Sequence, residues 1–328
     1  MFSPPIHRFL LCKKCVSCSN DFPLFANFVC VILASVDFSL STRTPCPNDQ
    51  NGNVWKDAEE WLSVTPLQVG ELKETCQTLL QQLPHASSFS FGLLSATCSL
   101  RSEHLVHFLG QQWLYDSQID AGLSLIQRNL PSSMHIAFVD TLFMTQLGLA
   151  RKRHATYVPH PERAIDQALF QGRVDKLEVP VNPGGTHWAG IQVDLRARTF
   201  HYRDGFNPGK LADPQDLELL SWFLASFGVN LMPYRSTSIL TPRQSDGNSC
   251  GIVLLSSLAA EHLSWRAWRQ SEAAQHRVEW FIRIAEARLD TVVWLHHNYS
   301  SMRVADNNLG PRRLAAKCTL HRKWCTSA

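Results

Sequence analysis

The chain reads Gln244-Ser245-Asp246-Gly247-Asn248-Ser249-Cys250-Gly251 immediately before an apolar run that begins at Ile252. The run continues through Leu258 and Ala259 at helical spacing, which predicts a buried helix that starts at Cys250. The positive end of a helix dipole favours the thiolate form of a cysteine at that position. Cys250 is therefore a candidate nucleophile at the start of a core helix.

Two further features of the same stretch suit a nucleophile. The Cys250 backbone N–H and the Gln244 side-chain amide are candidate donors to an oxyanion. Gly247 and Gly251 are predicted to let the backbone turn tightly around the cysteine.

A predicted hairpin upstream supplies a base and an acid. The alternating run 188–195 and the run Thr199–Arg203 flank the short turn Arg196-Ala197-Arg198, a pattern typical of an antiparallel hairpin. His187 stands at the start of the first strand and Asp204 at the end of the second, so the two side chains are expected side by side. An acid that hydrogen-bonds one imidazole nitrogen leaves the other to accept a thiol proton.

Each of these residues also has a purely structural interpretation. A cysteine on an apolar helix is usually a small core residue, a histidine before a tryptophan usually packs, and Asp-Gly usually forms a turn. Their joint order and placement favour thiol chemistry, and Cys76, Cys98 and Cys318 have no such setting.

The remaining pattern mixes helices and strands. Helices are expected from Trp55, over 67–83, 116–130, 141–148 and 164–170, and over 278–295; strands are expected at 134–139, 177–181 and, as an edge strand, at 230–235. The chain is therefore expected to combine helices with strands, two of which form the antiparallel hairpin.

Composition limits the function classes. The chain has 328 residues, 45% of them hydrophobic, and a formal net charge of +3, which suggests neither a nucleic acid nor a membrane as partner. Its ten cysteines lack the regular spacing of a disulfide framework, so the main domain is expected to be reduced and intracellular.

The first 53 residues differ from the rest and are expected to be a disordered leader or a mispredicted exon. The apolar stretch 22–36 is shorter than the roughly 20 residues of a membrane span. The cluster Cys12, Cys15 and Cys18 raises a zinc alternative, but the second ligand pair of a structural site is missing. The predicted organisation is a leader at 1–53, a catalytic domain at 54–300 with its core at about 111–260, and a basic tail at 301–328.

The order of His187-Trp188, Asp204 and Gln244 through Gly251 resembles that of the Ulp-type cysteine proteases, which process and deconjugate SUMO and related ubiquitin-like proteins. The segment Trp113-Leu114-x-Asp116-x-x-Ile119 resembles the family's first motif. Ser249 and Gly205 depart from the family pattern, which often has Asp before the nucleophile and Ser after the acid.

The resemblance implies a papain-like α+β fold, with the cysteine helix packed on a mainly antiparallel sheet. It also implies the triad Cys250, His187 and Asp204, with Gln244 at the oxyanion. It implies that Trp113 and Trp188 flank a narrow channel that Gly-Gly alone can thread, although core packing is an equal alternative for Trp113. The expected partner is a SUMO-type ubiquitin-like protein, acted on by a monomer without metal or cofactor in the nucleus or cytoplasm. A viral- or transposon-like polyprotein protease and a non-catalytic binding module remain as alternatives.

Overall fold

The computed structural model divides the chain into residues 1–50 and 51–328, and it describes residues 54–83, 89–90, 99–231 and 235–287. The predicted leader, its zinc alternative and the basic tail lie outside the described residues. Everything below concerns the second unit.

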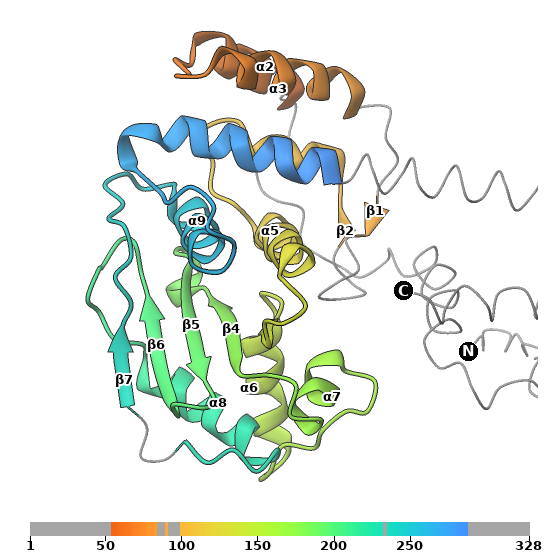
Figure 1. The fold of residues 1–328 in the computed structure, drawn as a ribbon, viewed down its shortest axis with the longest axis vertical. Helices are drawn as coiled ribbons and strands as arrows, with labels where there is room; N and C mark the ends of the chain where they lie inside the picture. The colour runs from red at the N-terminus through yellow and green to blue at the C-terminus, as the bar shows by residue number, and fades with distance from the viewer. Residues whose placement is uncertain (1–53, 84–88, 91–98, 232–234, 288–328) are drawn as a thin grey trace, which may run out of the picture. The chain divides into compact units, whose positions relative to one another are not determined.

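A five-stranded sheet forms the centre of this unit (Figure 1). Its order is β3-β4-β5-β6-β7, and the strands are β3 (Ile136–Phe138), β4 (Lys176–Val181), β5 (Ala189–Asp194), β6 (Thr199–Arg203) and β7 (Arg235–Ser238). The central pairings β4–β5 and β5–β6 are antiparallel, while β3–β4 and β6–β7 are parallel. The sheet is therefore mixed, with its antiparallel part at the centre.

Most predicted strands are confirmed, and the hairpin is β5–β6. The predicted edge strand is displaced: β7 begins at Arg235, where the prediction ended, although it does lie at the sheet edge.

One face of the sheet is apolar. Leu177, Val179, Ile191, Val193 and Phe200 belong to a buried cluster with residues of α6 (Phe143–Arg153) and α8 (Pro214–Ala225). The sequence analysis did not identify α8, although its start carries a clear signal. Asp213 accepts a hydrogen bond from the Gln215 backbone N–H, and Pro214 fills the first helical position.

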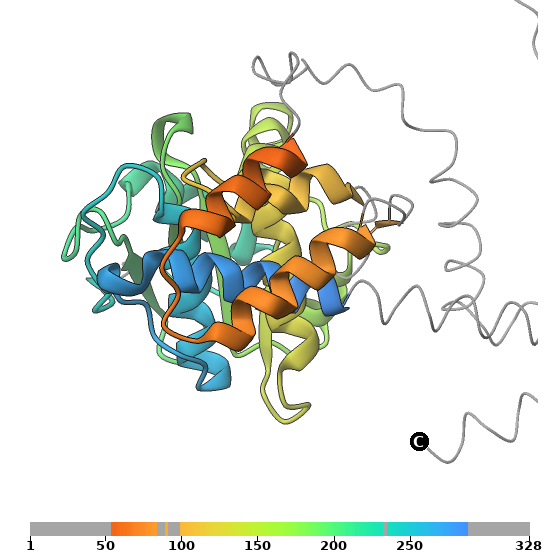
Figure 2. The same ribbon diagram turned by 90° about the horizontal axis from the view of Figure 1, so that it is seen from above.

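A second cluster is built from helices. It joins α9 (Cys250–Leu263), α5 (Asp116–Asn129), the helix at 273–287, α2 (Val54–Val64) and α3 (Gly70–Gln82). Figure 2 shows α2 and α3 lying over the helix at 273–287. The closest approach is between α5 and α9, where a Cβ on Gly122 would lie 2.5 Å from Leu255 Cδ1. This packing buries α9 in the molecule, as the sequence predicted.

Shorter elements complete the described part: β1 (Phe89–Ser90), β2 (Ser99–Leu100), α4 (Ser102–Leu105), α7 (Ala164–Phe170), and the 3-10 turns Val106–Phe108, Pro183–Gly185 and Gln270–Glu272. Among the described residues, no helix combines the length and apolar character that crossing a membrane requires.

Candidate active site

Cys250 is the first residue of α9 and is 4% exposed. The loop before it is held by the Asp246 carboxylate, which accepts hydrogen bonds from the Ser249 backbone N–H at 2.7 Å and from Gln270 Nε2 at 2.6 Å. The thiol therefore lies at the N-terminal end of a buried helix, next to a loop with little freedom.

His187 and Asp204 meet as the hairpin predicted. The register pairs Gly190 with Arg203, which brings the residues just beyond the two strands together, and His187 Nε2 lies 2.7 Å from Asp204 Oδ1. The Asp204 side chain is 1% exposed and also accepts the backbone N–H groups of Phe206 and Asn207 at 2.8 and 2.9 Å. This carboxylate therefore holds both the His187 ring and the backbone of Phe206 and Asn207 in place.

The electrostatics favour an ion pair. Burial alone would raise the pKa of Asp204, but hydrogen bonds from His187 and Asn207 outweigh it and lower that pKa to about 2. Hydrogen bonds to Asp204 and then to Cys250 raise the pKa of His187 from 6.5 to about 9. Because Asp204 occupies Nε2, Nδ1 is the nitrogen left for the Cys250 thiol.

Gln244 joins the acid's loop to the nucleophile's loop. It is 3% exposed, its backbone N–H donates to Gly205 O at 2.7 Å, and its side-chain Nε2 donates to Asp246 O at 2.6 Å. Nε2 also lies 3.4 Å from Asp246 Oδ1, so both of these contacts hold the amide against Asp246.

A hydrogen bond joins the segments of the two predicted channel tryptophans. Trp188 is 5% exposed, and its Nε1 donates to the backbone oxygen of Leu114 at 2.7 Å. Trp113, the residue before Leu114, is 44% exposed. Leu114 in turn packs against Gly251, where an added Cβ would lie 3.1 Å from Leu114 Cβ. The segment carrying Trp113 therefore passes beside the start of α9.

The two glycines have different surroundings. Neither Gly247 nor Gly251 has a positive φ, so the tight turn predicted at these residues does not use the left-handed conformation. Gly251 is needed for close approach, since an added Cβ would also lie 2.8 Å from Ile119 Cδ1, whereas a Cβ on Gly247 would meet nothing within 4 Å.

Arg277 is a site residue that sequence reasoning missed. It lies on the helix at 273–287, is 2% exposed, and its Nη2 donates to Gln112 O at 3.0 Å and to Asn248 O at 2.8 Å. Burial lowers the pKa of Arg277 to about 10, against the opposing effect of Asp246 and Cys250. No local motif marks this residue, because its partners are distant in sequence.

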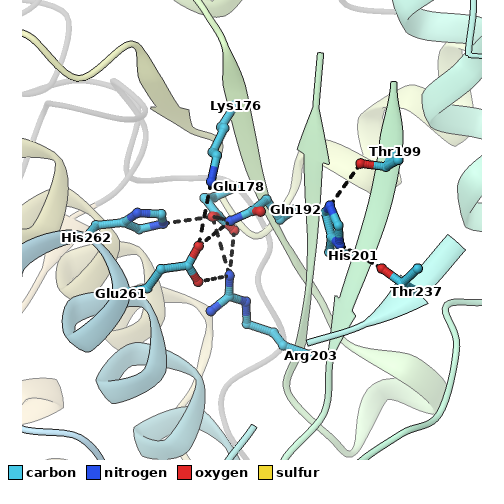
Figure 3. Close-up of polar contacts among 9 residues, drawn as sticks. All are labelled: Lys176, Glu178, Gln192, Thr199, His201, Arg203, Thr237, Glu261 and His262. Carbon is cyan, nitrogen blue, oxygen red and sulfur yellow. Dashed lines mark hydrogen bonds and ion pairs between the residues drawn. The ribbon is translucent and has the colours of Figure 1, made fainter. Parts of the chain in front are cut away.

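A buried polar network holds the far end of α9 on the sheet (Figure 3). Arg203 Nη2 lies 2.8 Å from Glu261 Oε2 and 3.4 Å from Glu178 Oε1, and His262 Nε2 lies 2.8 Å from Glu178 Oε1. Gln192 Nε2 donates to both carboxylates, at 2.6 Å to Glu178 and 2.8 Å to Glu261. The network also contains a group of side chains that could hold a metal ion, namely Glu178, Glu261 and His262. The Arg203 guanidinium already supplies positive charge to both acids of this group.

Cys76 is the other free cysteine among the described residues. It is fully buried in α3, and burial raises the pKa of its thiol to about 12. That environment suits a core residue and not a nucleophile.

The family model described as the Ulp1 protease family, C-terminal catalytic domain, matches residues 112–210, which include Trp113, His187, Trp188 and Asp204. No curated protein sequence matches the chain.

Three solved structures are similar in fold. A SUMO protease Ulp1 with its catalytic cysteine oxidised to a sulfinic acid has a TM-score of 0.50 and 17% identity, covering 68% of this chain and 98% of its own. A Ulp1 protease domain in complex with Smt3, the yeast ortholog of SUMO, has a TM-score of 0.48 and 14% identity, with 69% and 98% covered. The Chaetomium thermophilum Ulp1-like SUMO protease catalytic domain has a TM-score of 0.47 and 15% identity, with 68% and 90% covered.

The family match spans the segments that carry both tryptophans, the histidine and the acid, and the described fold is Ulp1-like. Over residues 112–210 the chain is therefore similar to the catalytic domain of the Ulp1 protease family, and its fold is like that of Ulp1.

Proposed function

We propose that the chain is a SUMO-type protease that cleaves after Gly-Gly of a ubiquitin-like modifier, in precursors or in conjugates. The observation that carries the proposal is the His187 imidazole, which Asp204 holds at 2.7 Å and whose pKa is raised by Asp204 and then by Cys250 at the start of α9. A binding module has no need for this arrangement.

In the proposed first step, Cys250 Sγ attacks the carbonyl carbon of the last glycine as a thiolate. The resulting oxyanion is stabilised by the Cys250 backbone N–H and the Gln244 side-chain amide. As the C–N bond breaks, protonated His187 donates its proton to the leaving amine, which departs neutral. The products of this step are a thioester on Cys250 and a free amine.

Hydrolysis of the thioester completes the cycle. His187, now neutral, accepts a proton from water as the water oxygen attacks the thioester carbonyl. The C–S bond breaks, the glycine carboxylate leaves, and the thiolate and imidazolium form again. Asp204 stays ionised throughout and stabilises the imidazolium, in keeping with its low pKa.

Substrate choice is assigned to the two tryptophans. In the proposal both border a passage to Cys250; the half-exposed Trp113 and the hydrogen bond that fixes Trp188 to the Leu114 backbone support this role. Two glycines without side chains suit such a passage, and larger residues do not. The family match and the Ulp1-like fold support the SUMO-type assignment.

The test uses modifier probes that carry a C-terminal electrophile, SUMO-type beside ubiquitin-type. We expect a covalent adduct with the SUMO-type probe that is lost in Cys250→Ala and retained in Cys76→Ala, the matched buried cysteine. A wild-type protein that forms no adduct with any probe and leaves SUMO precursors uncut would refute the proposal. Cleavage of unfolded peptides without a folded modifier would instead favour a polyprotein protease.

A further inference from the structure

An open groove of about 910 Å³ lies beside the site. Its walls are the loop that follows Asp204 and the loop that precedes Gln244, and they contribute the side chains Phe206, Pro208, Lys210, Leu240, Pro242 and Arg243. Two of the apolar side chains are unusually open to solvent, since Phe206 is 52% exposed and Leu240 is 97% exposed. Large apolar side chains gathered in one exposed groove are typical of a binding surface.

The groove is continuous with the catalytic groups. The Phe206 ring lies 5.8 Å from the His187 ring, and its backbone N–H donates to the Asp204 carboxylate at 2.8 Å. The Gln244 backbone N–H donates to Gly205 O at 2.7 Å, which joins the two walls at their base. A chain leaving the Cys250 region past His187 would therefore enter this groove.

The groove walls and the segment of Trp113 approach α9 at different residues. The segment of Trp113 and Leu114 approaches α9 at Gly251, whereas the groove walls approach it through Gly205, whose Cβ would meet Val253. If the modifier's tail reaches Cys250 between the tryptophans, the groove receives what lies beyond the scissile bond.

The charge of the groove is one-sided. Lys210 and Arg243 are its only charged lining residues, and no carboxylate lines it. Among the described residues, neither cation forms an ion pair. An occupant that carries acidic residues next to an apolar side chain complements both the cations and the exposed Phe206 and Leu240.

The geometry points to a leaving-group subsite: the groove binds the peptide segment on the far side of the scissile bond, and it selects segments that combine carboxylates with a large apolar residue. This inference rests on the proposed function and adds to it the chemistry of the released partner.

The test compares two substrates that share one modifier and differ only after Gly-Gly. One continues with two acidic residues and a leucine, and the other has lysines in place of the acids. We expect the wild type to prefer the acidic segment in kcat/KM, and Lys210→Glu/Arg243→Glu to shift the ratio by about tenfold toward the basic one at low ionic strength. The matched control Lys152→Glu/Arg153→Glu reverses two exposed charges on α6 and should leave the ratio unchanged.

Because the ratio is taken within each variant, a general loss of activity cancels. Equal kcat/KM for the two segments in the wild type, or an unchanged ratio in the groove variant, would overturn the subsite. A fluorogenic modifier amide, which has no peptide after the scissile bond, separates the two proposals. If the wild type turns over that amide but shows no preference between the acidic and the basic substrate, the subsite is wrong and the proposed function stands. If the wild type turns over none of the three substrates, the proposed function is wrong.

Discussion

At the residue scale, the His187 imidazole is held between an acid and a thiol. The hydrogen bond to Asp204 is the largest contribution to its raised pKa of about 9, so this carboxylate sets the pH range over which the imidazolium persists. Loss of that proton at high pH removes the general acid for the leaving amine.

Asp204→Asn is therefore expected to move the alkaline limb of the kcat/KM profile from about pH 9 toward 6.5, the ordinary pKa of histidine. It should also lower kcat/KM at pH 7.5 by at least about tenfold. The measurement is the pH profile for a fluorogenic modifier amide. Asp194→Asn, at the other end of the same hairpin, is the control, and an alkaline limb that stays in place would contradict the role of Asp204.

Gly205 shows why a residue without a side chain follows the acid. A Cβ there would lie 2.5 Å from Val253 Cγ1 and 3.2 Å from the backbone oxygen of Pro242. Gly205→Ala should cost about 1–3 kcal/mol of unfolding free energy and lower kcat, because it pushes the acid's loop away from α9. Urea unfolding and steady-state kinetics measure the two effects.

Gly247→Ala is the matched control, since its Cβ would meet nothing and its φ is not positive. Its unfolding free energy should stay within about 0.5 kcal/mol of the wild type. Adding Val253→Ala to Gly205→Ala should restore part of the lost kcat, and two equal losses from the two alanines would show that the contact with Val253 is irrelevant.

At the element scale, α9 is fixed at both ends. At its start, Arg277 links the Asn248 backbone to the Gln112 backbone and so ties the nucleophile's loop to the segment that carries Trp113. At its end, Glu261 and His262 join the network on the sheet.

Arg277→Lys keeps the charge, but its side chain is one atom shorter, so the ammonium cannot occupy the position of Nη2, which donates to both carbonyls. We expect it to slow adduct formation with the modifier probe by about tenfold while alkylation of Cys250 by iodoacetamide changes less, because the loss falls on the alignment of two loops. Arg283→Lys, on the same helix and stacked on Trp265, is the control. Equal effects of the two substitutions would remove the positioning role.

Arg203→Met leaves Glu178 and Glu261 close together without their shared cation. We expect a loss of about 3–5 kcal/mol in unfolding free energy, because the Glu178 charge stays buried and its arginine partner is gone. Adding Glu178→Leu should recover part of it. The exposed pair Arg101–Glu103 gives the contrast, since Arg101→Met should change the unfolding free energy by less than about 1 kcal/mol. A similar loss from both arginines would argue against the network.

At the scale of the whole molecule, three shifted groups shape stability against pH. Asp204 has a lowered pKa, so its contribution is lost as pH falls from 3.8 to about 2. Burial raises the pKa of Asp120 to about 7, so stability falls as pH rises from 3.8 to 7; the raised pKa of His187 adds a further loss from 6.5 to about 9.

The expected profile of unfolding free energy is highest in mild acid and falls in two overlapping steps above it. Asp120→Asn keeps an acceptor for the Thr141 backbone N–H and should remove the step between pH 3.8 and 7. Chemical unfolding at half-unit pH intervals measures both profiles. A variant profile parallel to that of the wild type would assign the loss to other groups.

The sequence predicted those parts of the fold whose signals are local. The alternation on either side of Arg196-Ala197-Arg198 predicted the β5–β6 hairpin, and the hairpin predicted the meeting of His187 and Asp204. The apolar run after Cys250 predicted α9 and its start.

What sequence reasoning missed depends on contacts between distant segments. The bounds predicted for β7 were wrong, because a strand pairs where its partner permits and not only where propensity is high. Arg277 and the Glu178–Arg203–Glu261 network have no spacing of their own, since each of their bonds joins separate elements. The packing reason for a glycine at position 205 could not be predicted from the sequence either, because Val253 approaches it only in the folded chain.

The distribution of the site over the chain has a consequence for its biosynthesis. A ribosome releases the hairpin with His187 and Asp204 first, then Cys250, and only afterwards the helix whose Arg277 locks the two loops around the thiol. A nascent chain therefore lacks the link between the loop before Cys250 and the segment that carries Trp113 until that helix has emerged and docked. Assembly of the site is in this way completed only by the last described helix to leave the ribosome.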